Sequence, residues 1–102
     1  LHPRFEIYVS PVNVDPISHA LPVAEPSNWG REIAEETGRF YTMGTPEDTA
    51  ALLQGVCSLP EFQSQTRLVF DEEHALLRYS LRHFAGGFVF FYFSTVDQNS
   101  HM

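Results

Sequence analysis

The hydrophobic and polar positions of the chain change period along its length, and each period predicts a different element. In "RFEIYVS", apolar Phe5, Ile7 and Val9 alternate with other residues, and this two-residue period predicts a β-strand over residues 1–10 with one buried face. Four prolines follow between positions 11 and 26. Because proline lacks a backbone donor and biases its predecessor towards extended geometry, residues 11–26 are expected to form an extended loop.

Three helices are predicted within residues 27–85. The first is expected in "NWGREIAEET", capped by Ser27 and ended by Gly38. The second is expected in "TPEDTAALLQG", with Thr45 as its cap and Pro46 at the first helical position, where the missing donor costs nothing. The residues that share one face of the first helix are Trp29, Ile33 and Thr37.

The third helix is the longest and is predicted from about Leu59 to Phe84. Ser58 and Glu61, three positions apart, have the capping-box pattern, and Gly86 and Gly87 are expected to end the helix. The apolar residues that recur along it at helical spacing are Phe62, Val69, Leu76, Leu77, Leu81 and Phe84.

The last apolar block, "FVFFYFS", is hydrophobic on both faces and predicts a fully buried strand over residues 88–94. Such a strand is typical of the interior of a parallel sheet with helices on both sides. The sequence therefore predicts an α/β fold in the order strand, loop, three helices, buried strand, followed by a loop over residues 95–102. Because a sheet of this kind needs further strands, the chain is interpreted as one segment of a larger domain.

The composition argues against several classes of protein. Six basic and thirteen acidic residues give a net charge of −7, which disfavours binding to nucleic acid or to an anionic membrane surface. No segment has the roughly 18 consecutive apolar residues of a transmembrane helix. Cys57 is the only cysteine, so an internal disulfide and a cysteine-rich zinc site are excluded, and a small core residue is the expected role.

Asp97 and His101 are the candidate metal ligands. They are four positions apart, directly after the predicted buried strand. Ligands in open α/β sheets bind beyond the carboxyl ends of the strands, and a turn or a first helical turn would let both side chains face one ion. A carboxylate oxygen and an imidazole nitrogen are ordinary zinc ligands, although a helix-capping Asp beside a surface His is the alternative.

The stretch "FVFFYFSTVDQNSHM", preceded by a long amphipathic helix, resembles the type I phosphodiesterase and nucleotide pyrophosphatase branch of the alkaline phosphatase superfamily. "YVSPVNVDP" and "GRFYTMGTPEDTAAL" also resemble segments that precede this motif in bacterial relatives. The resemblance implies a three-layer α/β/α sandwich. It also implies hydrolysis of phosphate esters, with diesters or pyrophosphates as the expected kind, by means of two divalent metal ions, with zinc as the expected metal. It assigns Asp97 and His101 to one metal.

The resemblance also implies that the chain is an internal fragment of a larger hydrolase. The family's hydroxyl nucleophile belongs upstream of this motif, and its remaining metal ligands belong downstream. The fragment alone is therefore expected to be inactive. Two alternatives are a non-catalytic α/β interaction module that self-associates through its apolar strand as a homo-oligomer, and a pseudoenzyme that has lost one metal.

Other polar residues are expected to have structural roles. Ser94 and Thr95 have no evident activating base. Asn13 and Asp15 have the pattern of a turn before Pro16, with a place in a substrate cleft as the less favoured alternative. The histidines without an assigned ligand role are His2, His19, His74 and His83, of which the last two are nine positions apart and point to different faces of the long helix. The acidic residues expected at solvated positions or at a helix N-terminus are Glu47, Asp48, Asp71, Glu72 and Glu73.

Overall fold

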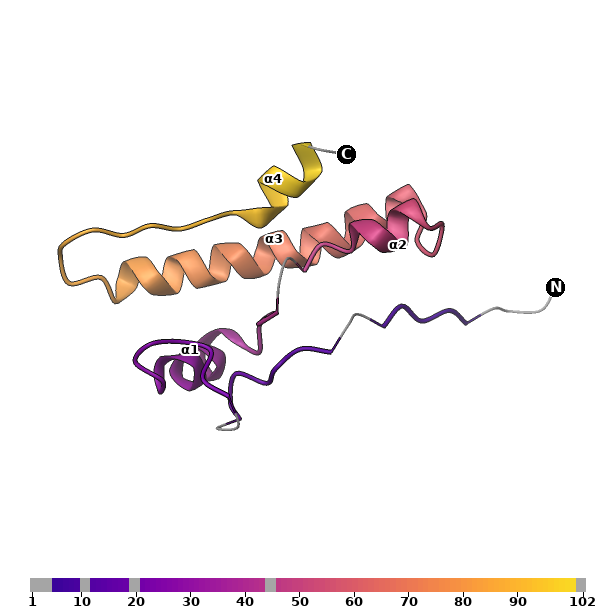
Figure 1. Ribbon diagram of the computed structural model, residues 1–102. Coiled ribbons are helices and arrows are strands. Elements are labelled where there is room, and N and C mark those ends of the chain that lie inside the picture. Colours follow the sequence, from indigo (N-terminus) through magenta and orange to yellow (C-terminus); the bar gives the residue numbers. More distant parts are fainter. Residues whose placement is uncertain (1–4, 10–11, 19–20, 44–45, 101–102) are drawn as a thin grey trace.

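A computed structural model of the chain describes residues 5–9, 12–18, 21–43 and 46–100. Within these residues the chain forms helices α1 (Trp29–Thr37), α2 (Thr49–Leu53), α3 (Leu59–Arg82) and α4 (Ser94–Ser100). The longest of them, α3, packs against each of the others (Figure 1). Helix α3 is therefore the frame on which the rest of the described chain is arranged.

Helix α3 begins where the sequence predicts and ends close to the predicted end. Its first turn has a complete capping box, in which the Glu61 backbone N–H donates to Ser58 Oγ at 3.3 Å and the Ser58 N–H donates to Glu61 Oε1 at 2.9 Å. These two bonds satisfy backbone donors that the helix itself leaves without partners. The helix ends at Arg82, two residues before the predicted end. The prediction of one long helix after Ser58 is therefore confirmed.

The buried face of α3 is only partly the predicted one. Val69 is 0% exposed and Phe62 is also fully buried. By contrast, Leu81 and Phe84 are exposed. Polar side chains are buried instead: Gln65, Thr66 and Glu73 lie on the covered face. Helical spacing identifies one face of a helix, but which parts of that face are covered depends on its neighbours.

The two shorter predicted helices form, with different caps. Helix α1 starts after Asn28 rather than after Ser27, and the Asn28 side chain donates to Glu32 Oε1 at 3.0 Å. Helix α2 is capped by Asp48, whose Oδ1 accepts from the Ala51 backbone N–H at 3.0 Å. The predicted cap of α2, Thr45, lies outside the described residues.

The predicted α/β fold is wrong, because the described residues contain helices and no β-strand. Residues 5–9 form no β-strand, and Phe5 of the predicted buried face is 87% exposed. Residues 88–93 are extended, with Phe88 and Phe90 exposed by 89% and 80%. Alternation specifies which side chains share a face, but a strand also needs a second backbone to pair with, and no ladder between strands forms among the described residues.

The predicted loop after the buried strand is also corrected. Ser94 is the first residue of α4, so helical backbone replaces both the end of the predicted strand and most of the predicted loop over residues 95–102. Gly86 and Gly87, which follow α3 as predicted, have φ values of 120° and 104°. This left-handed geometry suits glycine, and it turns the chain so that residues 88–93 run back along α3 (Figure 1).

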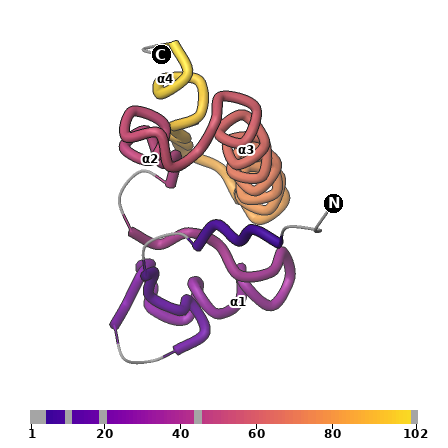
Figure 2. The backbone as a smooth tube through the Cα atoms, turned by 90° about the vertical axis from the view of Figure 1, so that its right-hand side faces the viewer, coloured from indigo at the N-terminus to yellow at the C-terminus, as the bar shows by residue number. Residues whose placement is uncertain are grey.

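The described chain is elongated. Its principal extents are 56, 30 and 21 Å, and its radius of gyration is 15.9 Å. A compact chain of this length has a radius of gyration of about 13 Å. Seen along α3, the helices α2 and α4 lie towards one end of the view and α1 lies towards the other (Figure 2). In the part of the chain that is described, no helix has the length and apolar character needed to cross a membrane.

Candidate functional site

Asp97, the first predicted metal ligand, lies in the first turn of α4. Its Oδ2 accepts a hydrogen bond of 2.8 Å from the Tyr92 hydroxyl, which comes from the extended segment just before the helix. This bond to Asp97, together with burial, raises the pKa of Tyr92. The second predicted ligand, His101, lies outside the described residues.

The start of α4 is anchored by a buried polar cluster that we call the Ser94 cluster: Glu47, Glu73, Ser94 and Thr95. The Glu73 carboxylate accepts three hydrogen bonds from the first two residues of α4. Two come from the backbone N–H of Ser94, at 3.0 Å, and from its hydroxyl; the third comes from the Thr95 hydroxyl at 2.8 Å. Thr95 is only 4% exposed, so these bonds are shielded from water.

A second carboxylate reaches the same serine from before α2. Glu47 Oε1 lies 2.7 Å from Ser94 Oγ, and Glu47 is 3% exposed. Its other oxygen, Oε2, is buried without a hydrogen-bond partner among the described residues. Buried carboxylates are costly unless they are hydrogen-bonded, so Glu73, with three bonds, is held better than Glu47.

The burial of Glu73 in the Ser94 cluster shows that the acidic run 71–73 is not the solvated face that was expected. Asp71 is exposed and pairs with Arg67, whereas Glu73 is buried. Glu72 is half-buried, and burial raises its pKa although the Tyr41 backbone N–H donates to it at 2.9 Å.

A sequence signal for Glu73 existed and was missed. Phe62, Thr66, Val69 and Glu73 follow one another at intervals of four, three and four, which places them on one face of α3. For Glu47, by contrast, the sequence offers only its place before a helix.

Side chains of the types that can bind metals do not gather into a site among the described residues. No group of three or more His, Cys, Asp or Glu side chains within residues 5–9, 12–18, 21–43 and 46–100 could hold a metal ion. His74 packs edge-on against Phe70, with ring centroids 4.5 Å apart, while His83 stacks on Tyr79 at 4.2 Å. The two histidines therefore have separate environments, as predicted; His2 and His19 lie outside the described residues.

Asp15 forms the predicted turn, whereas Asn13 contacts a distant part of the chain instead. Asp15 Oδ1 accepts from the Ile17 backbone N–H at 3.0 Å, a local turn. Asn13 Oδ1 accepts from the backbone N–H groups of Thr42 and Met43 at 3.0 and 3.1 Å. These contacts hold the loop against the connection between α1 and α2.

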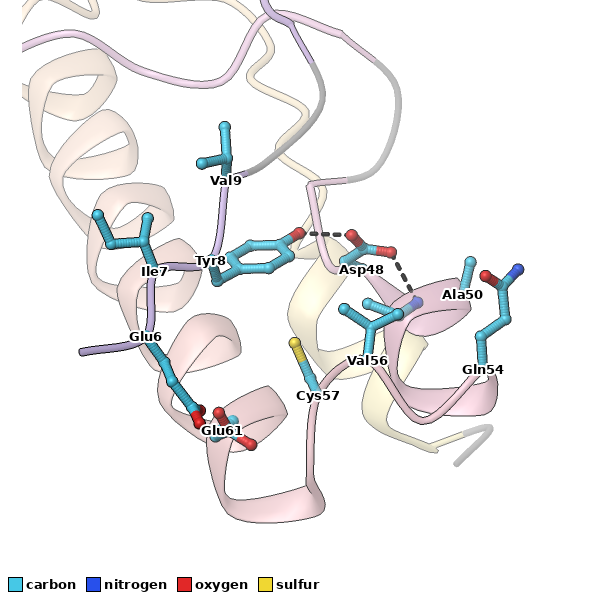
Figure 3. A pocket seen from close by; sticks show the side chains of 11 residues that line it. Glu6, Ile7, Tyr8, Val9, Asp48, Ala50, Gln54, Val56, Cys57 and Glu61 are labelled. Atoms are coloured by element: carbon cyan, nitrogen blue, oxygen red, sulfur yellow. Dashed lines mark hydrogen bonds between the residues drawn. The ribbon is translucent and has the colours of Figure 1, made fainter. Parts of the chain in front are cut away.

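A cleft of about 500 Å³ lies between residues 6–9 and the region of α2 (Figure 3). Its lining includes Glu6, Asp48 and Glu61 and, among the described residues, no lysine or arginine. The cleft therefore repels an anionic phosphate ester. Cys57 also lines it, but burial, followed by the nearby Glu61 and Asp48, raises the pKa of the thiol. A thiol that resists ionisation is a poor nucleophile, in agreement with the predicted structural role.

Comparison with known proteins gives no match: neither protein-family models, nor curated proteins, nor solved structures match this chain.

Proposed function

We propose that this chain is a segment of a metal-dependent phosphodiesterase or nucleotide pyrophosphatase-like hydrolase, in which Asp97 and His101 bind one of two divalent metal ions. The proposal rests on the resemblance of "FVFFYFSTVDQNSHM" to the type I phosphodiesterase and nucleotide pyrophosphatase branch of the alkaline phosphatase superfamily.

The observation that carries the proposal is the setting of Asp97. This carboxylate lies in the first turn of α4, while His101, the other proposed ligand, lies outside the described residues. The hydrogen bond that Asp97 accepts from Tyr92 supports the proposal as well, because carboxylates that bind metals are themselves oriented by such outer partners.

The donor set fits zinc, since a carboxylate oxygen and an imidazole nitrogen are both ordinary zinc ligands. When bound, two divalent ions activate a nucleophile and stabilise charge on the phosphate oxygens. Asp97 and His101 alone provide ligands for one ion, so the 102-residue chain by itself is expected to be inactive towards phosphate esters. The parent protein provides the nucleophile and the other ligands.

The test is hydrolysis of bis(p-nitrophenyl) phosphate by the full-length protein. Chelation of zinc, Asp97→Ala and His101→Ala are each expected to abolish turnover. Asp71→Ala is the matched control, because Asp71 is an exposed carboxylate on α3 outside the Ser94 cluster, and it should leave turnover unchanged. Normal turnover in either ligand variant would eliminate the site assignment.

A second candidate function is self-association of the chain as a non-catalytic interaction module. The observation that favours it is the exposure of Phe88 and Phe90 on an extended segment whose backbone pairs with no other segment among the described residues. Contiguous exposed apolar residues are typical of protein–protein contact surfaces.

A further inference from the structure

The Ser94 cluster links α3 to the first two residues of α4, the helix that contains the proposed metal ligand Asp97. Glu73 lies in the middle of α3 and receives every hydrogen bond that Ser94 and Thr95 direct to that helix: the Ser94 backbone N–H, the Ser94 hydroxyl and the Thr95 hydroxyl. A carboxylate that accepts three bonds from two adjacent residues restrains both the position and the direction of the helix that begins there.

Asp97 follows Ser94 by three positions, about one helical turn. Its place is therefore determined by where α4 begins and in which direction α4 runs. Tyr92, two residues before Ser94, donates to Asp97 Oδ2 at 2.8 Å, so the carboxylate is also held from the side of the extended segment. The Ser94 cluster and Tyr92 together leave the Asp97 carboxylate little freedom to move relative to α3.

We propose that Glu73 is a positioning residue for metal binding at Asp97, acting through Ser94 and Thr95. This inference rests on the proposed function, because it takes Asp97 to be a ligand. Glu47 is the weaker support: it contributes one contact to Ser94, and its Oε2 has no partner among the described residues. Removal of the Glu47 carboxylate should thus weaken metal binding less than removal of Glu73.

The experiment measures zinc affinity of the full-length protein by competition with a chromogenic chelator. Loss of an outer partner of a metal ligand typically weakens metal binding 10- to 100-fold. Glu73→Ala is expected to show a loss in this range of about 10- to 100-fold, and Glu47→Ala a smaller one. Glu73→Gln keeps an oxygen that accepts from Ser94 and should recover most of the affinity.

The Co²⁺-substituted protein provides a readout that lost stability alone does not change. In Glu73→Ala the visible absorption of bound Co²⁺ is expected to shift, because the Asp97 oxygen meets the ion in a different geometry, whereas Glu73→Gln should keep the wild-type spectrum. Asp71→Ala is the matched control on the same helix and should change neither the affinity nor the spectrum.

The outcomes separate the two proposals. Wild-type protein that does not bind zinc overturns the proposed function and the positioning role with it. Wild-type protein that binds zinc, with Glu73→Ala unchanged in affinity and spectrum, overturns only the positioning role. Should Glu73→Ala fail to fold, the double variant Ser94→Ala, Thr95→Val replaces it, since it removes both hydroxyl bonds to Glu73 and keeps the backbone one; unchanged affinity in the double variant then overturns the positioning role.

Discussion

At the scale of single residues, Asp48 joins two parts of the chain that are 40 positions apart. One of its oxygens accepts the hydroxyl hydrogen of Tyr8, and the other accepts from the Ala51 backbone N–H at the start of α2 (Figure 3). Burial and the Asp48 carboxylate together raise the pKa of Tyr8 above its ordinary value. Tyr8 thereby holds residues 5–9 beside α2.

The raised pKa predicts a loss of stability at alkaline pH. The neutral hydroxyl is the form that donates to Asp48, and Tyr8 of the unfolded chain ionises near pH 10, so the stabilisation is fully present below about pH 10 and is lost as the pH rises through the folded-state pKa. Urea unfolding of the wild-type chain and of Tyr8→Phe should show a constant difference in free energy below about pH 10 that shrinks above it. A difference independent of pH up to 12 would contradict this assignment.

Sequence reasoning at this scale succeeded where a residue's role is local. Asp15 forms its turn with Ile17, two positions away, and was predicted. Glu73 was missed because its partners, Ser94 and Thr95, are 21 and 22 positions away, and the acidic run around it suggests solvent. Composition of a run cannot distinguish a carboxylate that faces water from one that faces a distant hydroxyl.

At the scale of elements, α3 was predictable because its signals lie within one turn of its ends. Ser58 and Glu61 fix its start, and apolar spacing sustains it. The extended segment over residues 88–93 was predicted as a buried strand on its composition alone. Its burial depends on a partner sheet, and no local signal in the sequence reports whether one is present.

The capping box gives a prediction for α3. Ser58→Ala removes the acceptor of the Glu61 backbone N–H and should lower the free energy of unfolding by about 1 kcal/mol. Chemical denaturation monitored by circular dichroism measures this, with Ser64→Ala, an exposed serine in the same helix, as the control. A loss no larger than that of Ser64→Ala would show that the box does not stabilise the fold.

The same box has an acid dependence. The hydrogen bonds of Glu61 with the Ser58 side chain, the larger effect, and with the Ser58 backbone lower the pKa of Glu61. The stabilisation from the capping box is therefore present above the unfolded-state pKa of about 4.3 and is lost as the pH falls through the lower folded-state pKa.

At the scale of the whole molecule, the described chain combines an elongated shape with exposed aromatic side chains. Three phenylalanine side chains are largely exposed to water: Phe5, Phe88 and Phe90. By contrast, few apolar side chains of α3 are fully buried. The structure places Asp97 in the first turn of α4, and its role as a metal ligand stays a prediction from the short motif that it shares with His101. The sheet that was expected around it could not be assessed from sequence, because it depends on pairing across the whole fold.

The exposed aromatics predict that the 102-residue chain self-associates in solution. Replacing Phe88 and Phe90 by Ser should reduce the mass seen by light scattering, whereas Leu53→Ser, an exposed apolar residue on α2, should not. Because the net charge is −7, added salt should promote association by screening repulsion between copies. A clean monomer at high concentration would count against this prediction.

The anchoring of Ser94 by earlier carboxylates has a consequence for synthesis. Ser94 follows Glu73 by 21 positions and Glu47 by 47, so a ribosome releases both acids before the hydroxyl that they hold. Helix α3 can be complete in the nascent chain while its central carboxylate still faces solvent. The docking of α4 is thus among the last steps in the co-translational order of this part of the polypeptide.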